Sequence, residues 1–460
     1  MTRQGRAVHV DVTRLVDAGG ASREGEEGHS LQHRDRTMRR LGIATLGVTL
    51  AIAVISPAAL AGPSHAWTRH AHSDDYDEGY DVAVDAGRNS YIVGYTEGTF
   101  AGQTARGGSD AFIRKLRPDG STAWTRQFGT SSDDHAEAVT VDKHDRIYVV
   151  GVTRGAFPGN SHKGDDDVFV RKYRPNGAAL WTRQFGTDQR DVPSDVAVDK
   201  AGRVYIVGST FGAFPRHANR GADDAFVRKY RPDGAAVWTR QFGSASSDSA
   251  GGVTVDRNSR IYVAGSTSGR LPRQPDWGGS DAFLRRFEPN GRAVWTRQFG
   301  SGRNDHGRGA AVDGSGRVYV VGETAGRLPY QTNKGGSDAF LRGFDPRGRT
   351  VWTRQFGSSG NERRLDVAVD RHGAIYAAGR TTGVFAGQTG AGGLDGFVLK
   401  YSPRGKARWI RQFGTTEADG GWGVAVDARR RVHVGGITFG EFPGETVTGG
   451  SDAFVRVYRQ

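Results

Sequence analysis

Seven tryptophans stand 57 residues apart along the chain: Trp67, Trp124, Trp181, Trp238, Trp295, Trp352 and Trp409. Each opens the phrase Trp-Thr-Arg, or Trp-Ile-Arg at the last copy. A period of this length, kept without insertion or deletion, is typical of a repeat architecture in which each copy is one supersecondary unit. The single register therefore predicts one closed array rather than several unrelated domains.

Composition favours short strands and tight turns, since glycine is abundant (69 residues) and the apolar fraction is only 36%. The absence of cysteine excludes disulfides, thiolate metal sites and a cysteine nucleophile. The formal net charge of +13 favours anionic partners such as acidic polysaccharide or a cell-envelope component. No nucleic-acid recognition motif accompanies this charge, so nucleic acid is not an expected partner.

Residues 38–61 are predicted to be a secretory signal peptide. Arg39 and Arg40 precede an apolar run that closes on Ala59-Leu60-Ala61, with cleavage after Ala61 or Ala66. Residues 1–37 then form a non-structural or mis-annotated extension upstream of Met38. An uncleaved anchor is the alternative, because residues 41–62 could just span a bilayer of about 30 Å. Cleavage predicts a secreted, extracellular protein without stable membrane insertion.

Each repeat reads as four strands. The first carries Val-x-Val-Asp, as at 82–85, with a small central residue that suits strands crowded near an axis. After a turn, the second carries Tyr-Val-Val-Gly, as at 148–151. The third begins with Asp-Ala-Phe, and a Pro-Asp-Gly turn leads into the fourth, which holds the tryptophan. Residues 66–460 are therefore predicted to form an all-β, seven-bladed β-propeller with four antiparallel strands per blade.

The chain ends predict how the ring closes. Ala66-Trp67-Thr68-Arg69 reads as a fourth strand without the three that normally precede it, and the seventh repeat lacks its own fourth strand. We expect residues 67–69 to pair beside residues 453–458 and complete the last blade. Closure would remove the exposed strand edges that the alternative, an open solenoid, would leave.

These phrases resemble the seven-bladed β-propeller repeat (SBBP) family, with weaker likeness to NHL-type repeats. The resemblance is carried by Gly-Gly-Ser-Asp-Ala-Phe at 107–112, 335–340 and 449–454, by Pro-Asp-Gly-x-x-x-Trp, and by Val-Ala-Val-Asp followed by Tyr-Val-x-Gly. It covers about residues 66–460 and is specific for the fold. It implies that the Val-x-Val-Asp strand is innermost and the tryptophan strand outermost, with no assigned activity.

Basic and aromatic residues gather in the loops between the second and third strands of the second to fifth blades. The candidates there are His162, Lys163, Arg216, His217, Arg220, Arg273, Trp277, Tyr330 and Lys334. Adjacent crossovers add Arg303, Arg308, Arg363 and Arg364. Such residues on one side of one face predict a site for an anionic or glycan ligand. Ordinary loop variation in an arginine-rich protein is the alternative.

An acid occupies one register of every crossover: Asp77, Asp134, Asp191, Asp248, Asp305, Glu362 and Asp419. A ring of these groups near the channel mouth could hold a cation such as Ca²⁺. We favour the alternative, in which each carboxylate accepts backbone N–H bonds in its own turn, because every copy has one. No cofactor is expected.

Enzyme signatures are weak. Gly265-Ser-Thr-Ser-Gly269 imitates a nucleophile elbow, but threonine holds the nucleophile position. The histidines share no metal-ligand spacing. We therefore expect a monomeric, non-catalytic binding module for an anionic or carbohydrate extracellular ligand. A secreted hydrolase or lyase acting from the same loop face, and a structural extracellular module, are the alternatives.

Overall fold

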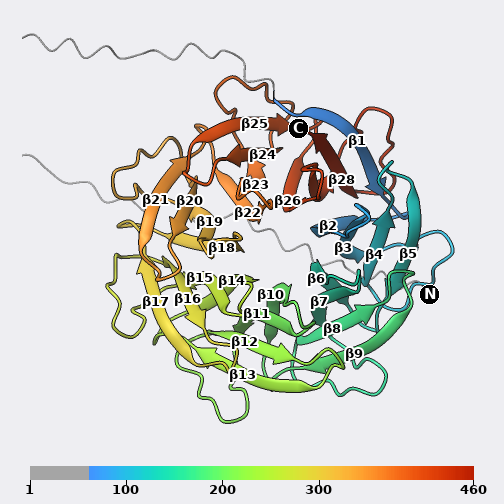
Figure 1. The fold of residues 1–460 in the computed structure, drawn as a ribbon. Helices are drawn as coiled ribbons and strands as arrows, with labels where there is room; N and C mark the ends of the chain where they lie inside the picture. The colour runs from blue at the N-terminus through green and yellow to red at the C-terminus, as the bar shows by residue number, and fades with distance from the viewer. Residues whose placement is uncertain (1–61) are drawn as a thin grey trace, which may run out of the picture. The chain divides into compact units, whose positions relative to one another are not determined.

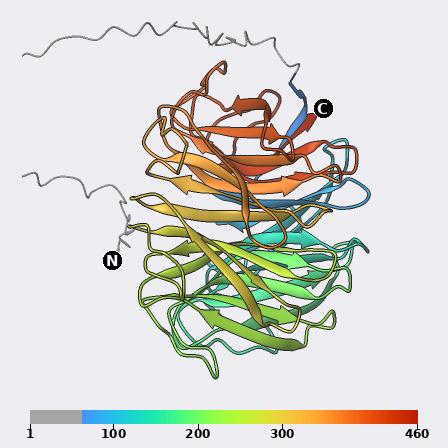
Figure 2. The ribbon, with the colours of Figure 1, turned by 60° about the vertical axis from the view of Figure 1, so that its left-hand side comes forward.

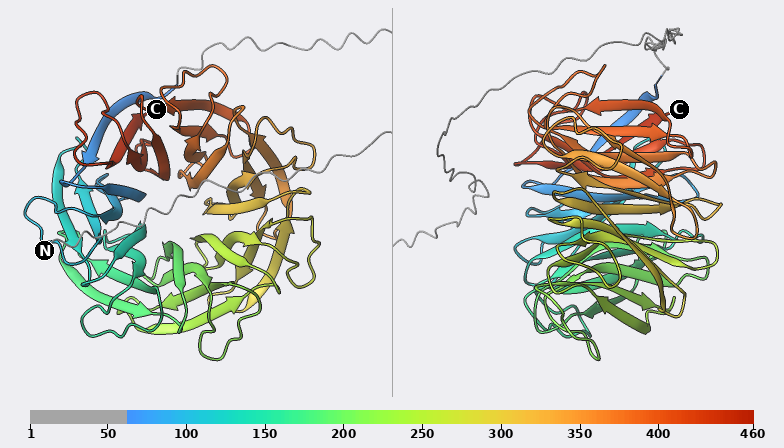
Figure 3. Two further views of the ribbon diagram at one scale, coloured as in Figure 1. Left: turned by 180° about the vertical axis from the view of Figure 1, so that it is seen from behind. Right: turned by 90° about the vertical axis from the view of Figure 1, so that its left-hand side faces the viewer.

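The computed structural model describes residues 62–460, so the predicted extension and signal peptide lie outside the described residues. Seven four-stranded antiparallel sheets surround a central axis (Figure 1), which confirms the predicted seven-bladed propeller. Figure 2 shows the same blades in an oblique view, and Figure 3 shows the ring from behind and edge-on. From Gly62 to the C-terminus, no helix is long and apolar enough to cross a membrane.

In every blade the four strands follow one another from the axis outward in the same order. The innermost strands are β2 (Asp77–Val84), β6 (Asp134–Val141), β10 (Asp191–Val198), β14 (Asp248–Val255), β18 (Asp305–Val312), β22 (Glu362–Val369) and β26 (Asp419–Val426). The second strands are β3 (Ser90–Thr96), β7 (Ile147–Thr153), β11 (Val204–Thr210), β15 (Ile261–Thr267), β19 (Val318–Thr324), β23 (Ile375–Thr381) and β27 (Val432–Thr438). The third strands are β4 (Asp110–Leu116), β8 (Asp167–Tyr173), β12 (Asp224–Tyr230), β16 (Asp281–Phe287), β20 (Asp338–Phe344), β24 (Asp395–Tyr401) and β28 (Asp452–Arg459). The outermost strands are β5 (Thr122–Phe128), β9 (Ala179–Phe185), β13 (Ala236–Phe242), β17 (Ala293–Phe299), β21 (Thr350–Phe356), β25 (Ala407–Phe413) and β1 (Ser64–Ala71).

The ring closes through β1. This strand pairs antiparallel with β28, with Thr68 opposite Arg456 and Ala71 opposite Ala453. Figures 1 and 3 show the blue β1 running along the red β28 at the outside of the seventh blade. Trp67 is 7% exposed and packs in a core cluster shared with the first blade. The predicted closure is therefore confirmed.

The hydrophobic core lies between blades. One cluster combines Tyr91 and Ile113 of the first blade with Val149, Phe157 and Phe169 of the second. Equivalent clusters recur around the ring. Each blade is a thin sheet and buries apolar surface only against its neighbours, so the stability of a blade depends on the next one.

The periodic Trp-x-Arg phrase fastens adjacent blades. Trp124 Nε1 donates to Pro175 O at 3.2 Å, and Arg126 Nε donates to Gly177 O at 3.1 Å. Gly177 has a φ of +80°, and a Cβ there would lie 3.0 Å from the indole of Trp124. The Pro-x-Gly turn thus needs its glycine both for its conformation and for the close approach of the ring. The repeated phrase serves the scaffold.

Candidate functional site

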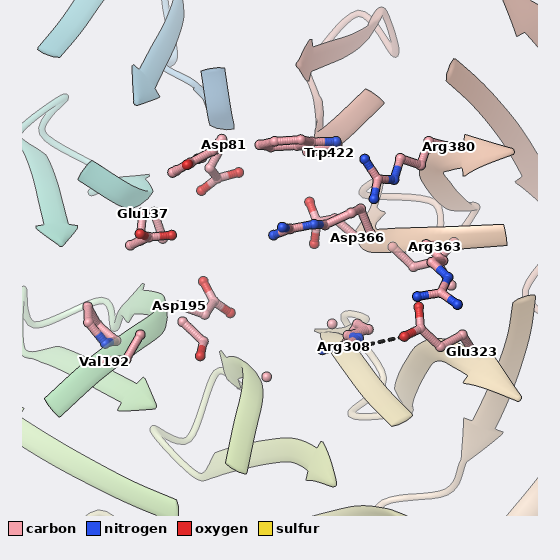
Figure 4. A pocket seen from close by; sticks show the side chains of 18 residues that line it. Asp81, Glu137, Val192, Asp195, Arg308, Glu323, Arg363, Asp366, Arg380 and Trp422 are labelled. Atoms are coloured by element: carbon pink, nitrogen blue, oxygen red, sulfur yellow. Dashed lines mark hydrogen bonds and ion pairs between the residues drawn. The ribbon is translucent and has the colours of Figure 1, made fainter. Parts of the chain in front are cut away.

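The central channel contains a cavity of about 560 Å³, lined by residues from all seven blades (Figure 4). Most of the lining comes from the innermost strands, at the bulge three residues after the crossover acid. This bulged residue faces the channel and has no partner in the second strand, as Tyr80 illustrates between Gly79 and Asp81. A bulge of this kind re-aims one side chain, so the lining can vary without disturbing the sheet.

The bulge position differs in every blade. Its occupants are Tyr80, Glu137, Ser194, Gly251, Arg308, Leu365 and Trp422, seven residue types in seven copies. By contrast, residues 82–84 and their equivalents in the other blades read Val-Ala-Val or Val-Thr-Val in most copies. The innermost strands therefore differ from blade to blade mainly at the residues that face the channel.

The sixth blade departs from the common bulge. In β22 the ladder is interrupted between Arg363 and Asp366, so that Arg364 and Leu365 both lie outside it. Leu365 is 4% exposed and packs in the core between the fifth and sixth blades. Arg364 is exposed to the channel instead, with a φ of +57° in the left-handed region. The two side chains have exchanged directions relative to the other blades.

Two energies explain the exchange. The equivalents of Arg364 are all buried and small: Gly79, Ala136, Pro193, Ala250, Gly307 and Gly421. A regular bulge would bury the guanidinium between blades, at an effective penalty of several kcal/mol for a buried ion. The left-handed conformation costs a residue with a Cβ about 1–2 kcal/mol, so it is the less costly arrangement. Strained residues of this kind cluster at functional sites.

Aromatic rings hold Arg364 in the channel. Its guanidinium carbon lies 4.8 Å from the ring centroid of Trp422, in a cation–π contact. Trp422 also stacks on Tyr80, with centroids 5.0 Å apart and an interplanar angle of 25°. Blades 6, 7 and 1 thus form one continuous stack at the channel wall.

Four arginines line the cavity and form what we call its basic wall: Arg308, Arg363, Arg364 and Arg380. Figure 4 shows Arg308, Arg363 and Arg380 together on one side of the cavity. Arg308 Nη2 donates to Glu323 Oε1 at 2.5 Å, while Glu323 Oε2 is buried without a hydrogen-bond partner in residues 62–460. Burial, and then repulsion by Arg364 and Arg363, lowers the pKa of the Arg380 guanidinium. The basic wall therefore holds positive charge that its single ion pair leaves uncompensated.

The opposite side, contributed by blades 1 to 3, is what we call the acidic wall: Asp81, Glu137 and Asp195 (Figure 4). Burial raises the pKa of Glu137 to about 7, opposed by the positive charge of Arg364. Burial also raises the pKa of Asp195 to about 7, although its oxygens accept backbone N–H bonds. Both carboxyls titrate near neutrality, as acids in functional clefts often do.

Three aspartates at one level of the channel stitch neighbouring blades together. Asp195 accepts from Val196 N at 2.6 Å and from Val253 N of the next blade at 2.7 Å. Asp81 bonds Val139 N and Asp366 bonds Val424 N in the same way, both at 2.8 Å. These carboxylates are committed to the scaffold. Glu137 forms no hydrogen bond or ion pair with the described chain, so it is free to meet a ligand.

The predicted ligand residues fall into two groups. Arg308, Arg363 and Arg364 come together in the basic wall. The others do not line the cavity. Arg303 lies on a crossover, and the rest lie in the loops between the second and third strands: His162, Lys163, Arg216, His217, Arg220, Arg273, Trp277, Tyr330 and Lys334. Tyr330 is fully exposed, and His217 Nε2 lies 3.1 Å from Thr239 O of the outermost β13. Loop tips and channel are thus separate surfaces.

The crossover acids are the first residues of the innermost strands. All seven are at most 1% exposed, and none lines the cavity. Each accepts a backbone N–H from four residues earlier, as Asp191 does from Thr187 N at 2.6 Å. Within the described range, no group of three or more His, Asp or Glu side chains has a geometry that could hold a metal ion.

Several lining residues were missed in the sequence analysis: Tyr80, Asp81, Glu137, Asp195, Glu323, Asp366, Arg380 and Trp422. A signal for many of them was present. They occupy the few positions of the first two strands where the 57-residue repeat does not repeat, the same criterion that directed attention to the loops. The exchange of Arg364 and Leu365 had no such signal, because it depends on the local bulge.

The family model of the SBBP beta-propeller repeat matches residues 123–158, 180–215, 237–272 and 294–329. Each match starts in an outermost strand and ends in the loop after the second strand of the next blade. The chain is a seven-bladed β-propeller that contains SBBP repeats. The predicted resemblance is thereby confirmed.

Relatives of this SBBP propeller add little about its role. It is 26% identical over 294 residues to the regulatory protein FlaEY of Caulobacter vibrioides, covering 53% of this chain and 29% of that protein. An uncharacterized WD repeat-containing protein of Acanthamoeba polyphaga mimivirus is 24% identical over 221 residues, covering 38% and 16%. The chain thus spans under a third of either relative. The structure of the polysaccharide lyase Uly1 superposes with a TM-score of 0.48 at 11% identity, covering 84% of this chain and 92% of the lyase, too distant to support an argument about activity.

Proposed function

We propose that this protein is a secreted, non-catalytic binding module whose channel takes an anionic ligand, such as an acidic polysaccharide or a cell-envelope component. The observation that carries the proposal is Arg364, which adopts a strained conformation to join the basic wall. Three of the four arginines come from the sixth blade and form no ion pair within residues 62–460, while Arg308 of the fifth blade pairs with Glu323. An anionic ligand would supply the missing negative charge.

The basic loop tips extend this proposal to the outer edge. Arg216 and Arg273 are exposed there and would contact a polymer too long for the channel alone. Exposed cations of this kind contribute mainly long-range attraction, which salt screens. We therefore assign affinity to the basic wall and capture of the polymer to the loop tips.

Binding to an array of uronate-, sulfate- and phosphate-bearing polysaccharides tests the proposal. Arg364→Ala and Arg380→Ala should each weaken binding about tenfold, the equivalent of about 1.4 kcal/mol, and binding should fall with salt. Arg404→Ala, in an exposed turn at the opposite ends of the strands, is the matched control and should bind like the wild type. Equal binding by all these variants would refute the channel site.

A second candidate function is hydrolysis or elimination on a glycan from the same cavity. The observation that favours it is Glu137, whose pKa near 7 suits a general acid or base at neutral pH. Turnover of an acidic polysaccharide by the wild type, abolished in Glu137→Gln, would establish it. Binding without turnover would support the binding module. If the protein shows neither binding nor turnover, the structural module would be supported instead.

A further inference from the structure

The cavity is divided by charge. The basic wall lies on the fifth and sixth blades, and the acidic wall lies across the channel on the first three (Figure 4). Two carboxylates also line the fifth and sixth blades, but Glu323 is paired with Arg308 and Asp366 accepts a backbone N–H from Val424. The two walls do not neutralise each other, since no ion pair joins a residue of one to a residue of the other in the part of the chain described. A space of about 560 Å³ separates opposite charges that face the same occupant.

Each wall has polar groups that form no hydrogen bond or ion pair with residues 62–460. On the basic wall these are the guanidinium groups beyond Arg308, together with the buried Glu323 Oε2, an acceptor that meets no donor in residues 62–460. On the acidic wall it is the carboxylate of Glu137, because the oxygens of Asp195 are occupied by backbone N–H groups. Buried polar groups are normally paired, so both walls favour a ligand that pairs them.

A ligand whose charges are all of one sign satisfies only half of this site. A polyanion that filled the cavity would place negative charge beside Glu137, and a cation would meet the four arginines. Like charges in a partly desolvated cavity are unfavourable, and opposite charges there gain more than at an open surface. The two walls therefore discriminate by the arrangement of charge as well as by its sign.

We infer that the channel ligand is a zwitterion, whose anionic group meets the basic wall and whose cationic group meets Glu137. This inference rests on the proposed anion-binding function and names its ligand class. A saccharide or short-chain fragment that carries both a carboxylate or phosphate and a protonated amine has this chemistry. The hydroxyl or N–H groups of such a body would also supply a donor for Glu323 Oε2.

A matched pair of probes tests the inference. At pH 8, linear ω-aminocarboxylates of graded length are titrated into the wild-type protein beside their N-acetyl derivatives, which keep the anion and lose the cation. At one length the amino form should bind about fivefold to tenfold more tightly than its N-acetyl derivative. Glu137→Gln should abolish this preference and leave the N-acetyl probe bound as well or better. Glu441→Gln, an exposed loop variant, is the control and should keep the preference.

The outcomes separate the two proposals. If the N-acetyl probes bind, and lose affinity in Arg364→Ala, but the wild type shows no preference for any amino form, the zwitterion inference is wrong and the anion site stands. If neither probe series binds, or Arg364→Ala changes nothing, the anion site itself is wrong. A thermal melt of Glu137→Gln that matches the wild type at pH 5 excludes misfolding as the cause of a lost preference.

Discussion

Arg364 allows the strained bulge to be tested through stability, without knowledge of the ligand. We compare Arg364→Gly with Arg364→Ala, since both remove the guanidinium and its contact with Trp422. They differ only in the Cβ and in backbone freedom. At an ordinary strand position glycine is less stable than alanine by about 0.5–1 kcal/mol. At a φ of +57° the order should reverse.

The magnitude follows from two opposing terms. Alanine keeps the left-handed cost of about 1–2 kcal/mol, from which glycine is free. Glycine loses about 0.5–1 kcal/mol of backbone entropy relative to alanine on folding. At the midpoints of these two ranges, Arg364→Gly should therefore be more stable than Arg364→Ala by about 0.75 kcal/mol, an inversion of the usual order.

Arg363 provides the matched control. It is the preceding residue, is also exposed and lines the channel, and is paired in the ladder without a positive φ. There the glycine variant should be the less stable one by about 0.5–1 kcal/mol. Urea unfolding with a common slope measures all four variants. If glycine is the less stable residue at both positions, the strain argument for Arg364 is refuted.

Three further predictions concern the scaffold and the acidic wall. A chain starting at Asp75 lacks β1, which removes the Trp67 core contact and uncovers the edge of β28. It should self-associate, measured by light scattering, or lose on the order of 5 kcal/mol of unfolding free energy, seen in thermal melts. Unchanged behaviour would contradict closure by β1. Trp238→Phe should cost about 0.5–1.5 kcal/mol more than Trp295→Phe in urea, since Trp238 Nε1 donates to Pro289 O and Trp295 Nε1 has no partner within residues 62–460. Equal costs would show that the indole bond contributes nothing. Glu137→Gln should be more stable than the wild type at pH 8 by on the order of 1 kcal/mol, and this difference in unfolding free energy should vanish toward pH 4.5. A difference that does not change with pH would contradict the raised pKa of Glu137.

The sign of the pH effect follows from the shift. The pKa of Glu137 rises from 4.5 to about 7 on folding, so the folded chain keeps a proton that the unfolded chain releases. The stabilisation is complete below pH 4.5 and is lost as the pH rises through 7. Glutamine has no charge to desolvate, and the nearby Arg364 limits the effect by favouring the ionised form.

The scaffold could be predicted because its physical requirements recur in every blade. Trp124, Arg126 and Gly177 recur in the other blades, since most neighbouring blades are joined by the same hydrogen bonds and ring packing. The pairing of β1 with β28 could be predicted from that repeat and the unfinished seventh copy. The innermost strands are longer than the Val-x-Val-Asp phrase indicated, because they begin at the crossover acid.

The channel could be predicted only in part. Arg308, Arg363 and Arg364 were among the predicted ligand residues, but grouped with loop tips that lie at the outer edge. Glu137 and Arg380 come from different strands of blades on opposite sides of the ring, and no local pattern brings them together. The reversal of Arg364 and Leu365 depends on a competition between ion burial and backbone strain, which the order of residues alone does not express.

The most direct test of the account is the affinity of an oligogalacturonate of defined length for three proteins: the wild type, Arg364→Ala and the loop-tip variant Arg273→Ala. Arg364→Ala should bind about tenfold more weakly than the wild type at the same salt concentration, whether that concentration is low or high. Arg273→Ala should show a smaller loss that disappears at high salt, because an exposed cation acts at long range. A large loss confined to Arg273→Ala would contradict the account and move the site to the loop tips.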